Sequence, residues 1–319
     1  MQAESLFPGS SLCVVGNINR DVKTAPLRAG TALFADGETS VASIVETIGG
    51  GGANSAFAAA SLGARASFAG KVGADALGDR LQRTLNHHGI AAHLTRDARH
   101  PSGTSIALAF DSGHRHFISC LLANAALTFA DVDLQMLHGH AHLLRADVWF
   151  SEAMLFEGNR LLFEAAQQDG LQVSLDLNWD PQWGRASADK IKARKQAVRD
   201  VLPLVNLAHG NVRELMEFAD APDLDIALQR LTAWGAEAVV VHLGAKGAGY
   251  YANGELIIEP PAPVQKHLHT TGTGDVLSVC MLLLHHRTDI AIRERLRLAN
   301  TIVAEFMDGR RMLIPPLSD

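Results

Sequence analysis

The residues best suited to chemistry stand in the segment HTTGTGDVLSVCML, residues 269–282. Its loop, just ahead of an apolar run with the length of a helix, consists of Thr270, Thr271, Gly272, Thr273 and Gly274. Backbone amides at the start of a helix, with the helix dipole behind them, can bind an anion. Asp275 would fall in the first turn, where its carboxylate could accept a hydroxyl proton while a phosphoryl group is transferred. Aspartate at such a position is more commonly an ordinary N-terminal cap, so both interpretations stay open.

Two other glycine clusters could bring backbone amides close to a ligand. In GGGGANSAFAAA, residues 49–60, four glycines precede a predicted helix, and Asn54 offers both a donor and an acceptor. The spacing matches neither the dinucleotide fingerprint nor the P-loop, so a purely structural turn is the competing interpretation. In VVVHLGAKGAGYY, residues 239–251, a buried strand ends in glycines, and ligands of α/β proteins bind at such strand ends. A simple strand-to-hairpin turn is the alternative there.

Hydrophobic patterning predicts the elements that must position these segments. Strands are predicted over 11–15, 66–72, 91–96, 147–150, 173–177 and 238–243, with a hairpin of 250–252 and 256–259. Helices are predicted over 53–62, 77–88, 158–168, 188–201, 212–218, 225–234, 276–286 and 290–307. Buried strands that alternate with helices indicate an α/β fold with a parallel sheet covered on both faces. The strand-rich segments 19–48 and 103–120, the latter a hairpin around 111–113, break that rhythm and could pair as a small separate sheet.

Two long motifs together resemble the signatures of one enzyme family. GGGGANSAFAAASLGARASFAGKVGADALGD, residues 49–79, and HTTGTGDVLSVCML are similar to the first and second signatures of the ribokinase-like sugar kinases, the phosphofructokinase-B carbohydrate kinase family. The resemblance covers essentially the whole chain. It implies one catalytic domain over 1–319, with a three-layer α/β/α core, a mostly parallel sheet, and a β-sheet lid formed by about 19–48 and 103–120. It also implies transfer of the γ-phosphate of ATP to a sugar hydroxyl, a primary one being favoured.

The resemblance assigns a role to each matching residue. Catalysis falls to Asp275 as general base and to an anion hole of Gly272, Thr273 and Gly274. Sugar binding falls to Asn19, Asp21, Gly50, Gly51, Asn54, Glu152 and Asp275. ATP binding falls to Asn211, Leu243, Gly244, Lys246, Gly247, Thr271, Gly272, Gly274 and Asn300. Glu214 of the motif NVRE would contact Mg²⁺ through water, and Asn178 after the strand 173–177 is a candidate for the phosphate side.

Two departures from the family pattern limit what the resemblance implies. His269 stands where the second signature usually begins with an aspartate that helps ribokinase to hold a monovalent cation. Histidine cannot replace an anionic oxygen ligand, so activation by K⁺ stays open. Gly51 stands where ribokinase carries a lysine, which weakens any expectation of ribose as substrate. The alternatives are a nucleoside kinase of the same family and a catalytically silent sugar-binding protein on this scaffold.

Composition excludes several classes of partner. The 319 residues are 47% hydrophobic with a net charge of −6, and no apolar run is long enough to span a bilayer. The sequence offers no concentrated basic face for nucleic acid and no secretory signal at its start. Cys13, Cys120 and Cys280 lie scattered in apolar stretches, so we expect them to be reduced and buried, as in a cytoplasmic protein. The expected partners are a sugar, ATP and, as the resemblance implies, a second copy bound through the lid.

Two further groups of polar residues are predicted to be solvated. His138, His140 and His142 have a spacing that could bind a metal on a helix, but no carboxylate or cysteine nearby completes a site. A solvated surface face is the favoured interpretation for them, and also for the basic helix over 190–199.

Overall fold

The computed structural model describes residues 7, 9–30, 33, 35–112, 114–269 and 271–317. Thr270 of the predicted anion loop lies outside these residues. Residues 1–6 and 8, in the part of the chain where no secretory signal is predicted, also lie outside them. None of the helices in the described ranges is long and apolar enough to cross a lipid bilayer.

A nine-stranded sheet forms the centre of the molecule, in the order β13-β12-β11-β10-β9-β8-β1-β4-β5. Its strands are β1 (Ser11–Val15), β4 (Arg65–Gly73), β5 (Ala91–Asp97), β8 (His142–Arg145), β9 (Gln172–Asp176), β10 (Leu207–Asn211), β11 (Ala238–His242), β12 (Ala248–Ala252) and β13 (Glu255–Glu259). All neighbours from β5 to β11 pair in parallel, and only the hairpin β12–β13 at one edge is antiparallel. The parallel strands therefore end along one edge, where ligands of α/β proteins bind.

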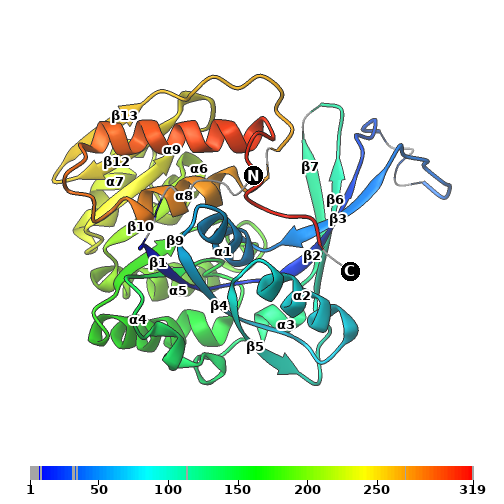
Figure 1. Ribbon diagram of the computed structural model, residues 1–319, viewed down its shortest axis with the longest axis horizontal. Coiled ribbons are helices and arrows are strands. Elements are labelled where there is room, and N and C mark those ends of the chain that lie inside the picture. Colours follow the sequence, from blue (N-terminus) through cyan, green and yellow to red (C-terminus); the bar gives the residue numbers. More distant parts are fainter. Residues whose placement is uncertain are drawn as a thin grey trace.

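Helices cover both faces of this sheet, as predicted (Figure 1). They are α1 (Gly51–Ser61), α2 (Ala76–His87), α3 (Leu122–Ala125), α4 (Asn159–Gln168), α5 (Ala188–Arg199), α6 (Val212–Ala219), α7 (Leu224–Ala233), α8 (Thr273–Leu283) and α9 (Ile292–Met307). Side chains of α1, α2, α8 and α9 pack into one hydrophobic core, and those of α4 to α7 pack into another. Alternate residues of β1 enter opposite cores, Leu12 and Val14 the first, Cys13 and Val15 the second. The result is a three-layer α/β/α arrangement.

A small four-stranded sheet stands at one side of this body (Figure 1). Its strands, in the order β3-β2-β6-β7, are β2 (Asn19–Thr24), β3 (Ile44–Gly49), β6 (Gly103–Ala109) and β7 (Arg115–Cys120). The central pair β2–β6 is parallel, and the outer pairs are antiparallel. The register places Asp21 beside Ser105 and Ser105 beside Ser119, so all three project from one face of the small sheet.

The prediction of the large sheet differs from the structure in three strands: β8 and β10 were not predicted, and a strand over 147–150 was predicted but is absent. The strand expected over 147–150 is wrong, because this stretch turns directly after β8, and Asp147 has a positive φ of 55°. Val148 and Trp149 are apolar because they fill the second core from the turn. The strand β10 was not predicted at all, since its sequence LAHGN contains few residues with a preference for strands.

The prediction of solvated polar groups is wrong for several side chains. His140 and His142 are buried, and burial lowers the pKa of His142 to about 3. Within the described ranges, no group of three histidine, cysteine or acidic residues could hold a metal ion. In α5, Arg194 and Lys195 are buried, and Arg194 forms an ion pair of 2.7 Å with Asp180. This helix therefore uses its basic residues to fasten itself to the body.

The three cysteines are unpaired but not alike. Cys13 and Cys280 are buried in the cores, as predicted, whereas Cys120 is exposed on β7. The prediction of burial fails there because both faces of β7 are open to solvent along its whole length.

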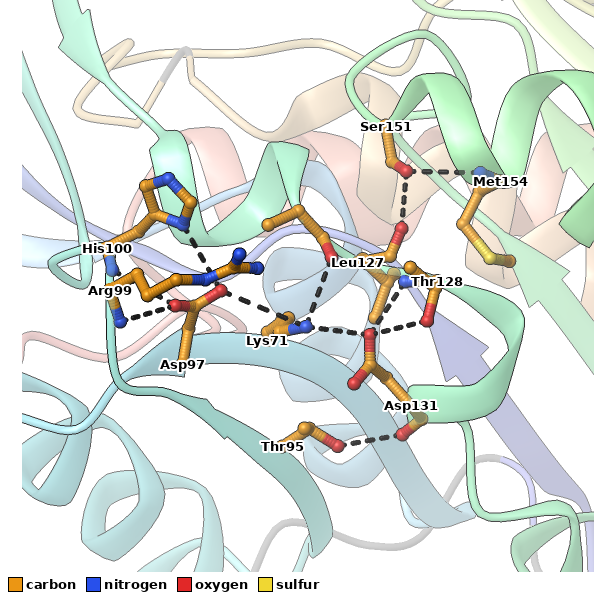
Figure 2. A network of polar contacts seen from close by, with 11 residues as sticks. Lys71, Thr95, Asp97, Arg99, His100, Leu127, Thr128, Asp131, Ser151 and Met154 are labelled. Carbon is orange, nitrogen blue, oxygen red and sulfur yellow. Dashed lines mark hydrogen bonds and ion pairs between the residues drawn. The ribbon is translucent and has the colours of Figure 1, made fainter.

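A polar network anchors the chain after α3 and the turn after β8 (Figure 2). Lys71 of β4 donates to the Ala126 carbonyl at 3.1 Å and to the Asp131 carboxylate at 2.9 Å. Ser151 donates to the Leu127 carbonyl and so ties the chain after β8 to the same segment. The loop that follows β8 is thereby fixed against β4, which matters because that loop carries a site residue.

Candidate functional site

Two cavities open near the start of α8. The first, of about 780 Å³, is called here the inter-sheet cavity because side chains of the small sheet form one wall. Its polar lining includes Asn17, Asn19, Asp21, Asn54, Ser105, Ser119, Asp147, Arg185, Arg213 and Thr271. The second, of about 540 Å³, is called the α8–α9 cavity. Its lining includes His242, Gly244, Gly247, Val264, Thr273, Gly274, Leu277, Asn300 and Val303.

Asp275 stands where the two cavities approach each other. Thr271 lines the inter-sheet cavity, whereas Thr273 and Gly274 line the α8–α9 cavity, and Asp275 follows directly in the chain. Its Oδ2 accepts a hydrogen bond of 2.8 Å from the side-chain amide of Asn54, at the start of α1. Gly272 is the N-cap of α8 with a φ of 84°, and no side-chain hydrogen bond caps the helix. Asp275 is therefore not an ordinary cap of this helix.

The surroundings of Asp275 favour its protonated form. Burial raises the pKa of Asp275 to about 8, the Asn54 hydrogen bond opposes this rise, and the charges of Asp147 and Glu214 add to it. Burial, together with the charges of Asp275 and Glu214, also raises the pKa of Asp176 at the end of β9. A carboxyl group with a pKa near neutrality, in a cleft, is suited to receive and release a proton.

Asp147 is a site residue that the sequence analysis missed. Its carboxylate accepts hydrogen bonds from the backbone amides of Asn17 at 2.9 Å, Gly52 at 2.8 Å and Gly51 at 3.3 Å. The amides at the start of α1, which were candidates for a ligand, thus bind a carboxylate of the protein itself. Glycine at 52 permits this arrangement, since a Cβ there would lie 2.7 Å from the Cα of Gly16. The glycine run is therefore in part the structural turn that was the alternative.

Replacement of Asp147 by alanine is expected to lower the free energy of unfolding by about 2 kcal/mol or more, because each buried donor left unpaired costs about 1–3 kcal/mol. Urea denaturation followed by circular dichroism measures the change. Asp147→Asn is the matched control, since it retains an acceptor oxygen of the same reach and should cost less. Equal midpoints for wild type and Asp147→Ala would contradict this role.

The structure brings most predicted sugar-binding residues to the inter-sheet cavity. Asn19, Asp21, Gly50 and Asn54 line it, and the Asn19 amide donates to Asp21 at 2.7 Å. Burial raises the pKa of Asp21. The Asn54 carbonyl oxygen is buried without a hydrogen-bond partner among the described residues.

Glu152 and Gly51 lie apart from that group. Glu152 is not among the described residues that line the inter-sheet cavity; its exposed carboxylate pairs with Lys190 at 2.8 Å and Arg194 at 3.4 Å. Gly51 lies beneath Asp147, because a Cβ at this position would come within 3.0 Å of the Asp147 carboxylate.

Four of the nine predicted ATP-binding residues line the α8–α9 cavity; of the other five, Thr271 lines the inter-sheet cavity, and Asn211 and Gly272 are in the described lining of neither. The four are Gly244, Gly247, Gly274 and Asn300, whereas Leu243 and the exposed Lys246 lie on the same turn outside the lining. The Asn300 amide donates to the carbonyls of Glu259 and Pro260, at 3.1 and 2.9 Å, and so holds the chain that leaves β13. His242, which the sequence analysis did not single out, lines the cavity, and burial lowers its pKa to about 4.

The motif NVRE forms a capping box at the start of α6. The Glu214 carboxylate accepts from the backbone amide of Asn211 at 2.8 Å, and the Asn211 side chain accepts from the backbone amide of Glu214 at 3.0 Å. Burial raises the pKa of Glu214. The carboxyl groups of Asp147, Asp176, Glu214 and Asp275 together make this edge of the sheet acidic.

Two further candidates have structural partners. Asn178 has a φ of 30°, and its side-chain oxygen accepts from the backbone amide of Asp147 at 2.9 Å, so it positions Asp147. His269 stacks on Phe306, with ring centroids 5.4 Å apart and an interplanar angle of 18°.

The inter-sheet cavity also holds aromatic and cationic residues that the sequence analysis did not assign to it. They are Phe117, Phe150, Trp179, Trp183, Arg185 and Arg213. The only local signal was the position of WDPQW just after the strand that ends at Asp176. No motif connects that segment with Arg213, which the fold of the large sheet brings to the same cavity.

Comparison with known sequences finds the same family throughout. The model of the pfkB family carbohydrate kinase matches residues 10–289. The ribokinase of Haemophilus influenzae is 26% identical over 290 residues, which cover 89% of each chain. Fructokinase-1 of Oryza sativa subsp. japonica is 27% identical over 286 residues, which cover 86% of this chain and 83% of that relative.

Solved structures share the fold over nearly the whole chain. Arabidopsis thaliana ribokinase complexed with ribose and ATP has a TM-score of 0.71 at 20% identity, covering 96% of each chain. An E. coli protein in complex with ATP and Mg²⁺ has a TM-score of 0.78 at 19% identity, covering 97% of this chain and 96% of that one. Adenosine kinase from Sinorhizobium meliloti has a TM-score of 0.75 at 19% identity, covering 93% and 94%. The fold predicted from the two signatures is confirmed.

Proposed function

The chain belongs to the pfkB family of carbohydrate kinases, phosphotransferases with an alcohol group as acceptor, and from this premise we propose that Asp275 is the general base of ATP-dependent phosphorylation of a sugar hydroxyl. One observation carries the proposal. The Asp275 carboxyl group, at the start of α8, is hydrogen-bonded to Asn54 of the polar inter-sheet cavity and follows Gly274 of the α8–α9 cavity, which has apolar walls. Two substrates bound in these cavities would meet beside a proton acceptor.

The acceptor would occupy the inter-sheet cavity. Asn19 and Asp21 present donors and acceptors suited to the hydroxyls of a polyol, and the unpaired Asn54 oxygen adds an acceptor close to Asp275. Asp275 would take the proton of the reacting hydroxyl as that oxygen attacks the γ-phosphorus atom, while the bond from this phosphorus to the β–γ bridging oxygen breaks and ADP leaves. The small sheet over the cavity would act as a lid that excludes water and so limits ATP hydrolysis.

ATP would occupy the α8–α9 cavity. Val264, Leu277 and Val303 give it apolar walls suited to a purine ring, and the amides around Gly272–Gly274 would stabilise charge on the transferred phosphoryl group. The acidic edge near Glu214 suits Mg²⁺, which prefers oxygen ligands and retains several waters. When bound, Mg²⁺ neutralises phosphate charge. An E. coli protein of this fold was solved in complex with ATP and Mg²⁺, which supports the binding of both by this chain.

Measurement of ADP release with Mg·ATP across pentoses, hexoses and nucleosides, with and without K⁺, tests the proposal. Turnover of a sugar is the expected result. Equal rates with and without K⁺ would agree with the position of His269, which stacks on Phe306. Binding of ATP without turnover of any acceptor would favour a silent sugar-binding protein instead.

A nucleoside acceptor is the second candidate, because the inter-sheet cavity has more aromatic side chains than its sequence indicated. Phe117, Phe150, Trp179 and Trp183 line it and could stack against a base. The adenosine kinase of Sinorhizobium meliloti shares this fold. A kcat/KM higher for adenosine than for every sugar would establish this candidate.

We also propose that the protein forms a homodimer through the outer face of the small sheet. We propose a cytoplasmic location, which the unpaired state of the described cysteines supports. Ile44, Ile106 and Ile118 share that face by register and are 62%, 40% and 55% exposed. Ile118→Glu is expected to convert a dimer to a monomer in sedimentation velocity, since it places a charge in the apolar contact. Ile258→Glu, on the edge strand β13, is the matched control; a monomeric wild type would contradict the proposal.

A further inference from the structure

The inter-sheet cavity contains two arginines whose charge is not used. Among the described residues, neither Arg185 nor Arg213 has a hydrogen bond from its guanidinium or an ion pair within 4.0 Å. The nearby Arg194 shows the contrast, because it donates to Asp180 at 2.7 Å and 3.1 Å and to the Trp149 carbonyl. Both arginines are exposed residues that line the cavity, so their guanidinium groups are accessible to a ligand bound there.

The Arg213 guanidinium is held in a defined place despite its lack of polar partners. Its Cζ lies 4.0 Å from the ring centroid of Trp179, and Trp179 packs edge-on against Trp183 with centroids 4.8 Å apart. Trp183 in turn packs against the buried Trp149. Stacking on an aromatic face fixes the guanidinium but leaves its N–H donors available for a planar anion.

Arg185 lies on an anchored turn between β9 and α5. The buried Asp180 accepts from the backbone amide of Gln182 at 2.9 Å and forms the ion pair with Arg194, so the base of the turn is fixed. The backbone amide of Arg185 donates to the carbonyl of Gln182 at 3.0 Å. Because these contacts already fix the backbone of the turn, little further backbone ordering is needed when the Arg185 side chain contacts a ligand.

The carboxylates near these arginines are engaged elsewhere. Asp21 accepts from Asn19, with Lys23 at 3.9 Å, and Asp147 accepts from backbone amides. The carboxylate of Glu214, next to Arg213 in the chain, accepts a hydrogen bond in the capping box of α6. The charge of Arg213 lowers the pKa of Glu214, but this effect is smaller than the rise caused by burial. The described lining of the α8–α9 cavity contains no lysine or arginine, so of the two cavities only the inter-sheet cavity has arginine side chains in its described lining.

We propose that the acceptor is a polyol that carries an anionic group, a carboxylate or a phosphate ester, bound by Arg213 and Arg185. This inference rests on the function proposed above and specifies its acceptor. The anionic group would lie against the two guanidinium groups while the polyol reaches Asn19, Asp21 and Asp275 in the same cavity. A hydrogen-bonded pair between arginine and an anion discriminates by about 10–100-fold in binding.

The test compares each anionic acceptor with a neutral partner of similar shape. D-Gluconate with D-glucitol and D-ribonate with ribitol form the carboxylate arm; fructose 6-phosphate with fructose and ribose 5-phosphate with ribose form the phosphate arm. The readout is the ratio of kcat/KM for the anionic to the neutral member, with KM for ATP measured beside it. We expect a ratio of about 10 or more in one arm.

Variants then assign the preference to the arginines. Arg213→Gln is expected to lower that ratio by about 10–100-fold, with KM for ATP within about twofold of wild type. Arg213→Lys keeps the charge but loses the planar donors, so it should lower the ratio less. Arg83→Gln, an exposed arginine of α2 outside the cavity, is the matched control and should leave the ratio unchanged.

Three other results of this experiment would each contradict a different part of the proposal. Turnover of neutral acceptors with ratios at or below 1 would overturn the anionic acceptor and leave the kinase proposal standing. An unchanged ratio with a raised KM for ATP in Arg213→Gln would assign Arg213 to the nucleotide. Absence of all turnover would overturn the proposed function, and calorimetric titration of the same pairs would then decide: tighter, Arg213-dependent binding of the anionic member supports the inference, and equal binding refutes it.

Discussion

Replacement of Asp275 by asparagine is expected to lower kcat by about 10²–10⁴-fold, the usual contribution of a positioned general base. Asparagine fills the same volume but cannot accept the hydroxyl proton. The hydrogen bond from Asn54, now 2.8 Å long, can be kept through the remaining carbonyl oxygen, so the start of α8 should retain its geometry. Calorimetric titration with Mg·ATP should therefore give a Kd close to that of wild type.

Asp225→Asn is the matched control for this experiment. Asp225 is likewise an acidic residue in the first turn of a helix, α7, but it is exposed and lies outside both cavities. Its replacement should leave kcat unchanged. If Asp275→Asn retained most of its turnover, the proton would have to leave by another route and the assignment of the base would be wrong.

The second large effect is expected from pH. A base must be deprotonated to accept a proton, and burial raises the pKa of Asp275 to about 8. Below that pH, the deprotonated fraction of Asp275 falls about tenfold for each pH unit, and kcat/KM for the acceptor should fall in proportion. Above the inflection, kcat/KM should reach a plateau. Because half of the carboxyl groups are already protonated at pH 8, the expected loss between pH 8 and pH 6 is about 50-fold.

The hydrogen bond from Asn54 makes it possible to test whether Asp275 causes this pH dependence. Its hydrogen bond favours the charged form of Asp275 and lowers the pKa of that carboxyl group, so Asn54→Ala should move the inflection of kcat/KM to higher pH. The position of the inflection, and not the size of the rate, is the readout, because Asn54 also lines the acceptor cavity. A wild-type profile that is flat from pH 6 to 9 would contradict the pKa of Asp275 as the controlling quantity.

The sequence predicted the parts of the site that lie in local motifs. The predicted anion loop and Asp275 lie within a few residues of each other, and the apolar run that follows them marks the helix α8. Strand β1 was predicted with its observed bounds, because SLCVV is strongly apolar and ends at a glycine. Local order of this kind is encoded by neighbouring residues, which is why patterning reveals it.

The missed residues act through contacts that no local pattern encodes. Asp147 binds the start of α1 from a turn whose apolar residues resembled a strand, and the distance along the chain hides the connection. Arg213 lies within the motif NVRE, whose spacing predicts the capping box but no contact of Arg213. Arg213 stacks on Trp179 because the two residues follow the neighbouring parallel strands β10 and β9. Such pairs require the tertiary fold, so a single sequence could not identify them.

The parallel pairing of β2 with β6 has a consequence for the order in which the protein folds. The register joins Asn19 to Gly103, and the chain between them forms β3, α1, β4, α2 and β5. Such a long loop cannot close early at low entropic cost, so the central pair of the small sheet must wait until that part of the core has formed. Asp21 and Ser105 therefore come together only after the elements between them have folded, so this wall of the inter-sheet cavity is completed late.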